Sequence, residues 1–143
     1  MKYSKATNYA LHTMVLLTLA QKGKAVGVEQ LATAQNLSAT YLSKILTKLV
    51  KAGLIESAPG VKGGYSLVKR SSEVSFLDVI YAIEGNTTLF SCSLEHETWS
   101  RNEACLIENV MIEAETKMKD ELSKKTIVDI AKKIAAQKKH CVT

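Results

Sequence analysis

Reactive side chains are concentrated in one polar stretch in the second half of the chain. Cys92 and Cys105 are separated by twelve residues, and His96 lies between them. A thiolate is the reactive form of cysteine, and a nearby histidine or cationic side chain lowers the pKa of a thiol. Oxidation of Cys92, with or without pairing to Cys105 or to a cysteine of a second subunit, would make this stretch a redox sensor.

Other chemistries are open to the same side chains. Cys92, His96 and Cys105 could bind a metal ion, although their spacing matches no strong zinc signature. Cys105 precedes Leu106 and Ile107, so it could instead be a small core residue. An enzyme would use Cys92 as nucleophile and His96 as base, but no third orienting group or oxyanion loop is visible. We therefore expect no enzymatic activity, while thiol sensing and a purely structural role both stay open.

A second chemical feature is basic and lies between residues 38 and 65. Three lysines step by four and three residues and therefore share one face of a helix: Lys44, Lys48 and Lys51. Apolar residues at helical spacing form the opposite face: Leu42, Ile45, Leu46 and Leu49. Thr40 and Tyr41 fall in the first turn, from which a recognition helix reaches base edges. This pattern predicts a helix that binds DNA with one face and packs with the other.

A glycine-rich turn follows this helix. Strand-like runs at 54–57 and 65–68 flank it, and Lys62 lies near its tip, with glycines at 60, 63 and 64. The pattern predicts a β-hairpin wing suited to phosphate or minor-groove contact. A nucleotide-binding P-loop is disfavoured because its following Lys-Ser/Thr and helix are missing.

The spacing of apolar residues predicts six helices that position these groups. They fall at 3–21, from 26–28 through 35, at 39–52, from Ser75 to Glu84, at 102–124 and from Thr126 onward. The second and third, joined by Asn36-Leu37-Ser38, form a helix-turn-helix. We expect a mainly α fold with a small β-hairpin wing.

The fifth predicted helix is long for so small a protein. At ~1.5 Å per residue it spans about 33 Å, too far for the rest of the chain to cover. We expect it to pack against its mate in a symmetric homodimer. The chain then divides into a winged helix-turn-helix domain at 1–85, a sensor-like loop at 86–102, and the dimerisation and C-terminal helices at 103–143.

Composition and charge fit a DNA-binding protein. The 143 residues are 46% hydrophobic with a net charge of +5. Residues 1–70 hold ten Lys/Arg and two acidic residues, a balance of +8, whereas residues 71–143 hold nine and twelve, a balance of −3. The basic half suits an anionic partner. No apolar run approaches the ~20 residues of a membrane helix, and the N-terminus lacks a signal peptide's apolar core, so we expect a cytoplasmic protein without a membrane partner.

Short motifs along the chain match a known group of proteins. They include Tyr9-Ala10-Leu11, Leu37-Ser38, Tyr41-Leu42, Ala52-Gly53-Leu54-Ile55, Gly63-Gly64-Tyr65, Asp78-Val79-Ile80 and Ile83-Glu84-Gly85. On these residues the chain resembles the bacterial winged-helix regulators typified by the iron–sulfur cluster regulator IscR and the nitric-oxide-sensing repressor NsrR.

The resemblance implies a homodimeric transcription factor, usually a repressor, that binds double-stranded DNA at a dyad-symmetric operator. It places each third helix in a major groove and each wing in a minor groove. The nominated groove contacts are Ser38, Thr40, Tyr41 and Lys44. The nominated phosphate contacts are Lys48 and Lys62, with Ser4 and Lys5 at the start of the first helix, and the wing adds Gly63, Gly64 and Tyr65.

The resemblance weakens at the sensor. Cluster-binding members carry three cysteines before the long helix, whereas here Glu95–Ser100 occupies the middle position. Asn8 stands where some members offer a carboxylate ligand. A cluster is held by several thiolates, so we expect no cofactor. Three interpretations remain: control by thiol oxidation at Cys92 and Cys105, an iron–sulfur regulator, or an unknown signal with structural cysteines.

Overall fold

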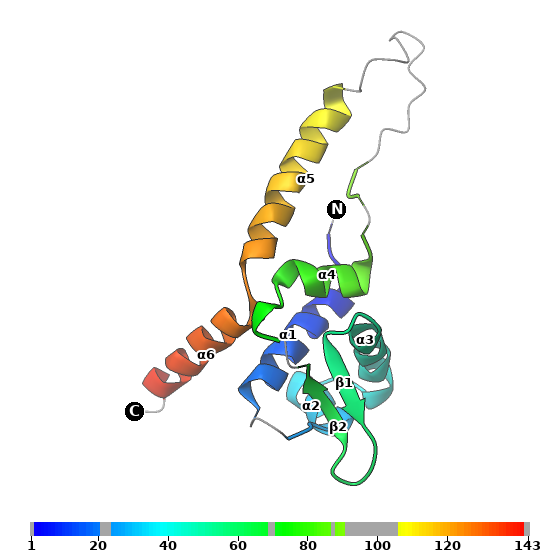
Figure 1. The fold of residues 1–143 in the computed structure, drawn as a ribbon, viewed down its shortest axis with the longest axis vertical. Helices are drawn as coiled ribbons and strands as arrows, with labels where there is room; N and C mark the ends of the chain where they lie inside the picture. Colours follow the sequence, from blue (N-terminus) through cyan, green and yellow to red (C-terminus); the bar gives the residue numbers. More distant parts are fainter. Residues whose placement is uncertain (1, 21–23, 69–70, 87, 91–105, 142–143) are drawn as a thin grey trace.

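The computed structural model describes residues 2–20, 24–68, 71–86, 88–90 and 106–141, and it is mainly helical (Figure 1). Its elements follow the chain in this order: α1 (Lys5–Leu19), α2 (Val28–Gln35), α3 (Ala39–Lys51), β1 (Ile55–Ala58), β2 (Gly64–Leu67), the 3₁₀ turn η1 (Ser71–Glu73), α4 (Phe76–Glu84), α5 (Leu106–Lys124) and α6 (Ile127–Cys141). The mainly α fold with a two-stranded wing is therefore confirmed.

The helix ends follow from local chemistry. Ser4 caps α1, since its Oγ accepts the Thr7 N–H, and Ser38 caps α3 by accepting the Tyr41 N–H at 3.1 Å. Asn36 ends α2 in the left-handed region, with φ of 56°, which asparagine tolerates better than most residues. The helix-turn-helix is thus formed by a left-handed asparagine and a capping serine two residues later.

The first helix is shorter than the apolar pattern predicts. It ends at Leu19, with Ala20 as its extended C-cap, while the predicted stop at Gly23 lies outside the described residues. The predicted start of the fifth helix at Asn102 also lies outside them, and α5 is described from Leu106.

One apolar core joins α1, α3, α4 and the start of α6. It includes Ala10 and Met14 of α1, Leu42, Leu46 and Leu49 of α3, Val79 of α4, and Ile127 of α6. The leucines of α3 are fully buried, as their spacing predicts. This packing fixes α3 so that its opposite face points outward.

The hairpin is antiparallel, with Ile55 opposite Leu67 and Ala58 opposite Gly64. A third backbone segment joins it at Val26, where Val26 and Tyr65 exchange two N–H···O bonds of 2.8 Å. This bridge ties the residues before α2 to the wing.

The two C-terminal helices are held to the rest of the protein by a second bridge, between Ser75 and Thr126. The Phe76 N–H donates to the Lys125 carbonyl at 2.9 Å, and the Ile127 N–H donates to the Val74 carbonyl at 3.0 Å. From this point α6 packs against α1, while α5 runs alongside α4 and then away from the body, at the end opposite the hairpin (Figure 1).

The first turns of α5 carry exposed apolar side chains. Leu106 is 78% exposed, Val110 64% and Ile107 58%. No helix in the described ranges is long and apolar enough to cross a membrane.

Candidate nucleic-acid interface

The outer face of α3 is polar, basic and accessible. Its exposed residues are Thr40, Tyr41, Lys44, Thr47, Lys48 and Lys51, and the exposed Ser38 precedes them as the N-cap. Thr47 Oγ1 donates to the Ser43 carbonyl at 2.8 Å, which turns that hydroxyl back toward the helix backbone. The structure therefore brings together every groove contact nominated on this helix, on one exposed surface.

Tyr41 is held by a contact that the sequence pattern does not reveal. Its ring meets the Tyr9 ring of α1 edge to face, with centroids 5.9 Å apart. Such pairs add about 0.5–1.5 kcal/mol beyond area burial. Tyr41 stays 38% exposed, so one side of its ring is oriented by α1 while the other side faces solvent.

The wing separates its candidate contacts into two kinds. Val61 and Lys62 lie at the exposed tip of the loop, whereas Gly63, Gly64 and Tyr65 lie where the loop joins β2 and are only partly exposed. A Cβ on Gly63 would lie 2.2 Å from the Ala58 carbonyl oxygen, so glycine is needed there to close the turn. The Tyr65 side chain packs against the core. Lys62 is thus presented for contact, and the three residues after it hold the wing in shape.

Ser4 and Lys5 open α1 beside the end of α4, where an unpredicted carboxylate lies. Glu84 Oε1 accepts hydrogen bonds from the Ser4 N–H, the Ser4 hydroxyl and the Thr7 hydroxyl, each at 2.7 Å. The Ser4 hydroxyl is thus occupied by a hydrogen bond within the protein, whereas no such bond engages the Lys5 side chain in the described part of the chain, and both residues are exposed. Glu84 lies 80 residues from Ser4, and no local sequence signal could have paired them.

The cluster affects the ionisation of Glu84. The hydrogen bonds from Thr7 and Ser4 lower the pKa of this carboxyl below its ordinary value of 4.5, and the positive charge of Lys48 lowers it further. Because Lys48 belongs to α3, the carboxylate at the end of α4 acts electrostatically on the basic face. The same carboxylate also stabilises the start of α1, where a negative charge is favoured.

Substituting Glu84 by Gln tests this cluster. The folded-state pKa is depressed, so the stabilisation is fully present above the ordinary carboxyl pKa and is lost as the pH falls through the folded value. We expect E84Q to lower the unfolding free energy by about 1 kcal/mol at neutral pH, with solvent screening allowed for. Urea denaturation should show the difference shrinking below about pH 4.

The matched control is E121Q, whose carboxylate makes an exposed ion pair with Lys125 at 3.5 Å. Such pairs contribute little, so E121Q should unfold like the wild type. An E84Q protein as stable as E121Q at neutral pH would contradict the assigned role.

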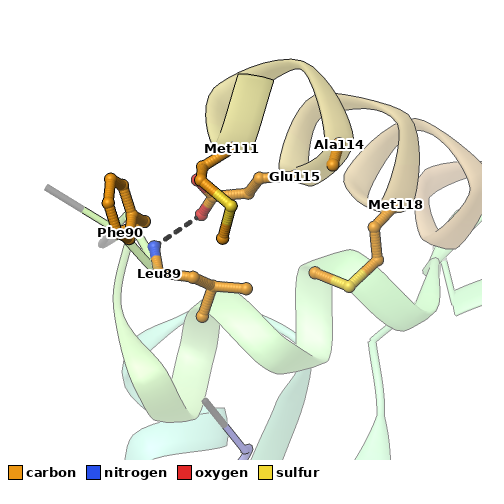
Figure 2. A pocket seen from close by; sticks show the side chains of 6 residues that line it. All are labelled: Leu89, Phe90, Met111, Ala114, Glu115 and Met118. Carbon is orange, nitrogen blue, oxygen red and sulfur yellow. Dashed lines mark hydrogen bonds between the residues drawn. The ribbon is translucent and has the colours of Figure 1, made fainter. Parts of the chain in front are cut away.

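A small apolar pocket lies where the segment after α4 meets α5. Leu89, Phe90, Met111 and Met118 line it with Ala114, around about 160 Å³ of space (Figure 2). At its edge the buried Glu115 accepts the Leu89 N–H at 2.8 Å, the dashed line of Figure 2.

Lys119, the ion-pair partner of this carboxylate, links α5 to α4. Lys119 Nζ lies 3.2 Å from Glu115 Oε1 and 5.6 Å from the centre of the Tyr81 ring. The residues that lead into the candidate sensor stretch are thus attached to both helices.

The candidate sensor itself lies outside the described residues, since Cys92, His96 and Cys105 fall in the range 91–105. Within the described ranges, no group of three or more histidine, cysteine or acidic side chains is placed to hold a metal ion. Asn8 is exposed on α1, and its carbonyl accepts the His12 Nδ1–H at 2.8 Å.

Comparison with known proteins agrees with this architecture. The sequence model of the Rrf2 family, described as an iron-dependent transcriptional regulator, matches residues 3–133. The chain is 34% identical over 132 residues to the HTH-type transcriptional regulator NsrR of Halalkalibacterium halodurans, which covers 91% of this chain and 90% of that protein.

Solved structures show the same arrangement of helices. CymR, the global cysteine regulator of Bacillus subtilis, superimposes with a TM-score of 0.76 at 25% identity, covering 92% of this chain and 97% of CymR. The oxidized form of Staphylococcus aureus CymR gives 0.72 at 28% identity, covering 92% and 96%. With its helix-turn-helix, its wing and these relatives, the chain belongs to the Rrf2 family of transcriptional regulators and is not an enzyme.

Proposed function

We propose that the protein is a homodimeric, sequence-specific repressor that binds a dyad-symmetric operator in the cytoplasm. The observation that carries the proposal is the exposed basic face of α3, held outward by a buried leucine face and flanked by the projecting wing. In a helix-turn-helix protein such a helix enters the major groove. Two copies related by a two-fold axis would meet two half-sites of one operator.

Each candidate contact has a role in this proposal. Ser38, Thr40, Tyr41 and Lys44 face the bases, and Lys48, Lys62 and Lys5 neutralise phosphates. Ser4 acts through its cap of α1, and Gly63, Gly64 and Tyr65 act by shaping the wing. Residues 1–85 provide the DNA-binding domain, 86–102 the sensor, and 103–143 the dimerisation and C-terminal helices.

Salt dependence of operator binding tests the proposal. Neutralising six or more phosphates lowers affinity by at least about a thousandfold between about 50 and 200 mM salt. Lys48→Ala should weaken binding to the operator and to an unrelated duplex alike, and it should reduce the salt slope by about 1. Lys44→Ala should instead weaken binding to the operator more than binding to the unrelated duplex. Fluorescence anisotropy over a salt series measures both effects.

Lys132→Ala is the charge-matched control, because Lys132 is exposed on α6, which lies on the side of the body opposite α3 (Figure 1). It should leave both affinities unchanged. A wild-type affinity for the operator that does not change over this salt range would refute DNA binding through phosphate neutralisation.

We propose that DNA binding is controlled by oxidation of Cys92. The existence of an oxidized form of a relative with the same fold supports this. The family is described as iron-dependent, but the cysteines of this chain favour thiol oxidation over binding of an iron–sulfur cluster. Only Cys92 and Cys105 precede α5, and an iron–sulfur cluster commonly needs four ligands. These residues therefore do not fit a cluster.

The proposed chemistry begins with the Cys92 thiolate. Hypochlorite would convert it to a sulfenic acid with release of chloride, and a second thiol, from Cys105 or the other subunit, would displace water to form a disulfide. Operator binding with and without hypochlorite should change in the wild type and stay constant in Cys92→Ser. If hypochlorite changes operator binding equally in the two proteins, Cys92 is not the sensor. If protein purified without air absorbs visible light as an iron–sulfur cluster does, the cluster interpretation would replace thiol sensing.

A further inference from the structure

A broad hollow lies between the wing tip and the start of α2. Lys24, Gly27 and Gln30 line one side, and Lys62 and Gly63 line the other, around about 640 Å³. Both lysines are exposed. Sequence reasoning assigns no role to Lys24, because it precedes the helix-turn-helix and belongs to no motif.

The backbone sets the width of this hollow. Two reciprocal hydrogen bonds of 2.8 Å between the Val26 and Tyr65 backbones join the two walls of the hollow. Val26 is adjacent in sequence to the lining residue Gly27, and Tyr65 is two residues from the lining residue Gly63. Gly64 lets the walls come this close, since a Cβ there would lie 2.5 Å from the Val26 carbonyl oxygen. Lys24 and Lys62 are thus attached to backbone segments whose separation is fixed, although they are 38 residues apart in sequence.

The hollow is positively charged. No acidic side chain lines it, and within the described part of the chain the lysines in ion pairs are Lys119, Lys124 and Lys125. Glu29 follows in the first turn of α2 and faces solvent. Two lysines on opposite walls suit an anion that can contact both.

The size of the hollow indicates what kind of anion it takes. A volume of about 640 Å³ is far larger than one phosphate and can accept a stretch of sugar-phosphate backbone. In helix-turn-helix proteins, the helix before the recognition helix crosses the DNA backbone. Here that helix is α2, and the hollow lies at its start.

We propose that this hollow binds a segment of one DNA strand, with one phosphate beside Lys24 and a neighbouring one beside Lys62. The inference rests on the DNA binding proposed above and adds Lys24 as a contact. Through the bridged walls, α2 and the wing would hold the same strand, which fixes the orientation of the domain on the duplex. Such contacts position a protein without reading sequence.

The test uses full-length protein carrying Lys24→Ala, Lys62→Ala or both, with the operator and an unrelated duplex. Each single variant should weaken binding to both DNAs by the same factor and lower the slope of log affinity against log salt by about 0.9. The double variant should lower this slope by about twice as much. Lys24→Arg should retain the wild-type slope, since a cation at this position is sufficient.

The control is again Lys132→Ala on α6. If Lys24→Ala has the affinity and slope of Lys132→Ala while the wild type binds its operator normally, the inference is wrong and the proposed function stands. If the wild type shows no salt-dependent binding, the proposed function itself fails.

A second arm distinguishes DNA from a free anion. Millimolar inorganic phosphate at constant ionic strength should displace the operator neither from the wild type nor from Lys24→Ala. If it displaces the operator from the wild type but not from Lys24→Ala, the hollow would be a free-phosphate site, and the DNA assignment would be overturned.

Discussion

Replacing Ile107 and Val110 by Glu should convert the protein to a monomer and weaken operator binding at least about a hundredfold. Both side chains are apolar and more than half exposed on the first turns of α5, where the described part of the chain leaves them uncovered. Burying such residues against a second copy contributes about 25 cal/mol per Å² of apolar surface. Two glutamates at this surface would oppose that association in both subunits, because a two-fold interface repeats each change.

The loss of affinity follows from the two half-sites. In a dimer the second recognition helix binds at a high effective concentration, which commonly raises affinity by about 10²–10⁴ over one site. Sedimentation should show the change in mass, and anisotropy should show weak operator binding with unchanged affinity for an isolated half-site.

Thr116→Glu is the control for added charge on the same helix. Thr116 is exposed and lies six residues from Val110, a third of a turn away around α5. This variant should remain dimeric. If the double glutamate variant sediments as a dimer and binds the operator tightly, the first turns of α5 are not the dimer interface.

Gly64→Ala should have the largest effect on the wing. The residue has a φ of +138°, which L side chains rarely adopt. Its new Cβ would also lie 2.5 Å from the Val26 carbonyl oxygen and 2.9 Å from the Gly27 nitrogen, and both are backbone atoms that yield only if the bridge opens. We expect a loss of about 2–4 kcal/mol in unfolding free energy, from strain together with the broken bridge.

Gly60→Ala separates the two causes. Gly60 has a φ of +100°, but a Cβ there meets nothing within 4 Å. Gly60→Ala should therefore lower the free energy of unfolding only by the backbone strain, about 1 kcal/mol. Urea denaturation and operator binding of the two variants side by side measure the difference. Equal stability would mean that the wing does not depend on its contact with Val26.

The sequence predicts those features that depend on neighbouring residues. The apolar spacing of α3 places its leucines correctly, and the helices expected after Ser38 and from Ser75 do begin there, where those serines cap α3 and α4. Asn36 identifies the turn because few other residues take its backbone conformation without strain. The hairpin follows from the glycines and the strand-like runs on either side.

Several features that sequence reasoning misses join distant segments. Glu84 contacts Ser4, and Val26 pairs with Tyr65, without any periodic pattern that would reveal either contact. The glycines at 63 and 64 mark a tight turn in the sequence, but only the structure identifies the backbone atoms that they approach, the carbonyl oxygens of Ala58 and Val26. The cysteine chemistry stays a prediction, since residues 91–105 lie outside the described part of the chain.

The return of α6 to α1 limits how this regulator can be dissected. Ile127 and Ala131 are almost fully buried, and Ile127 belongs to the same core as the leucines of α3. A fragment cut after residue 85 would therefore keep every candidate DNA contact and yet lack part of its own interior. A graft of the proposed DNA-binding domain onto another protein's dimerisation helix would therefore have to include α6 as well.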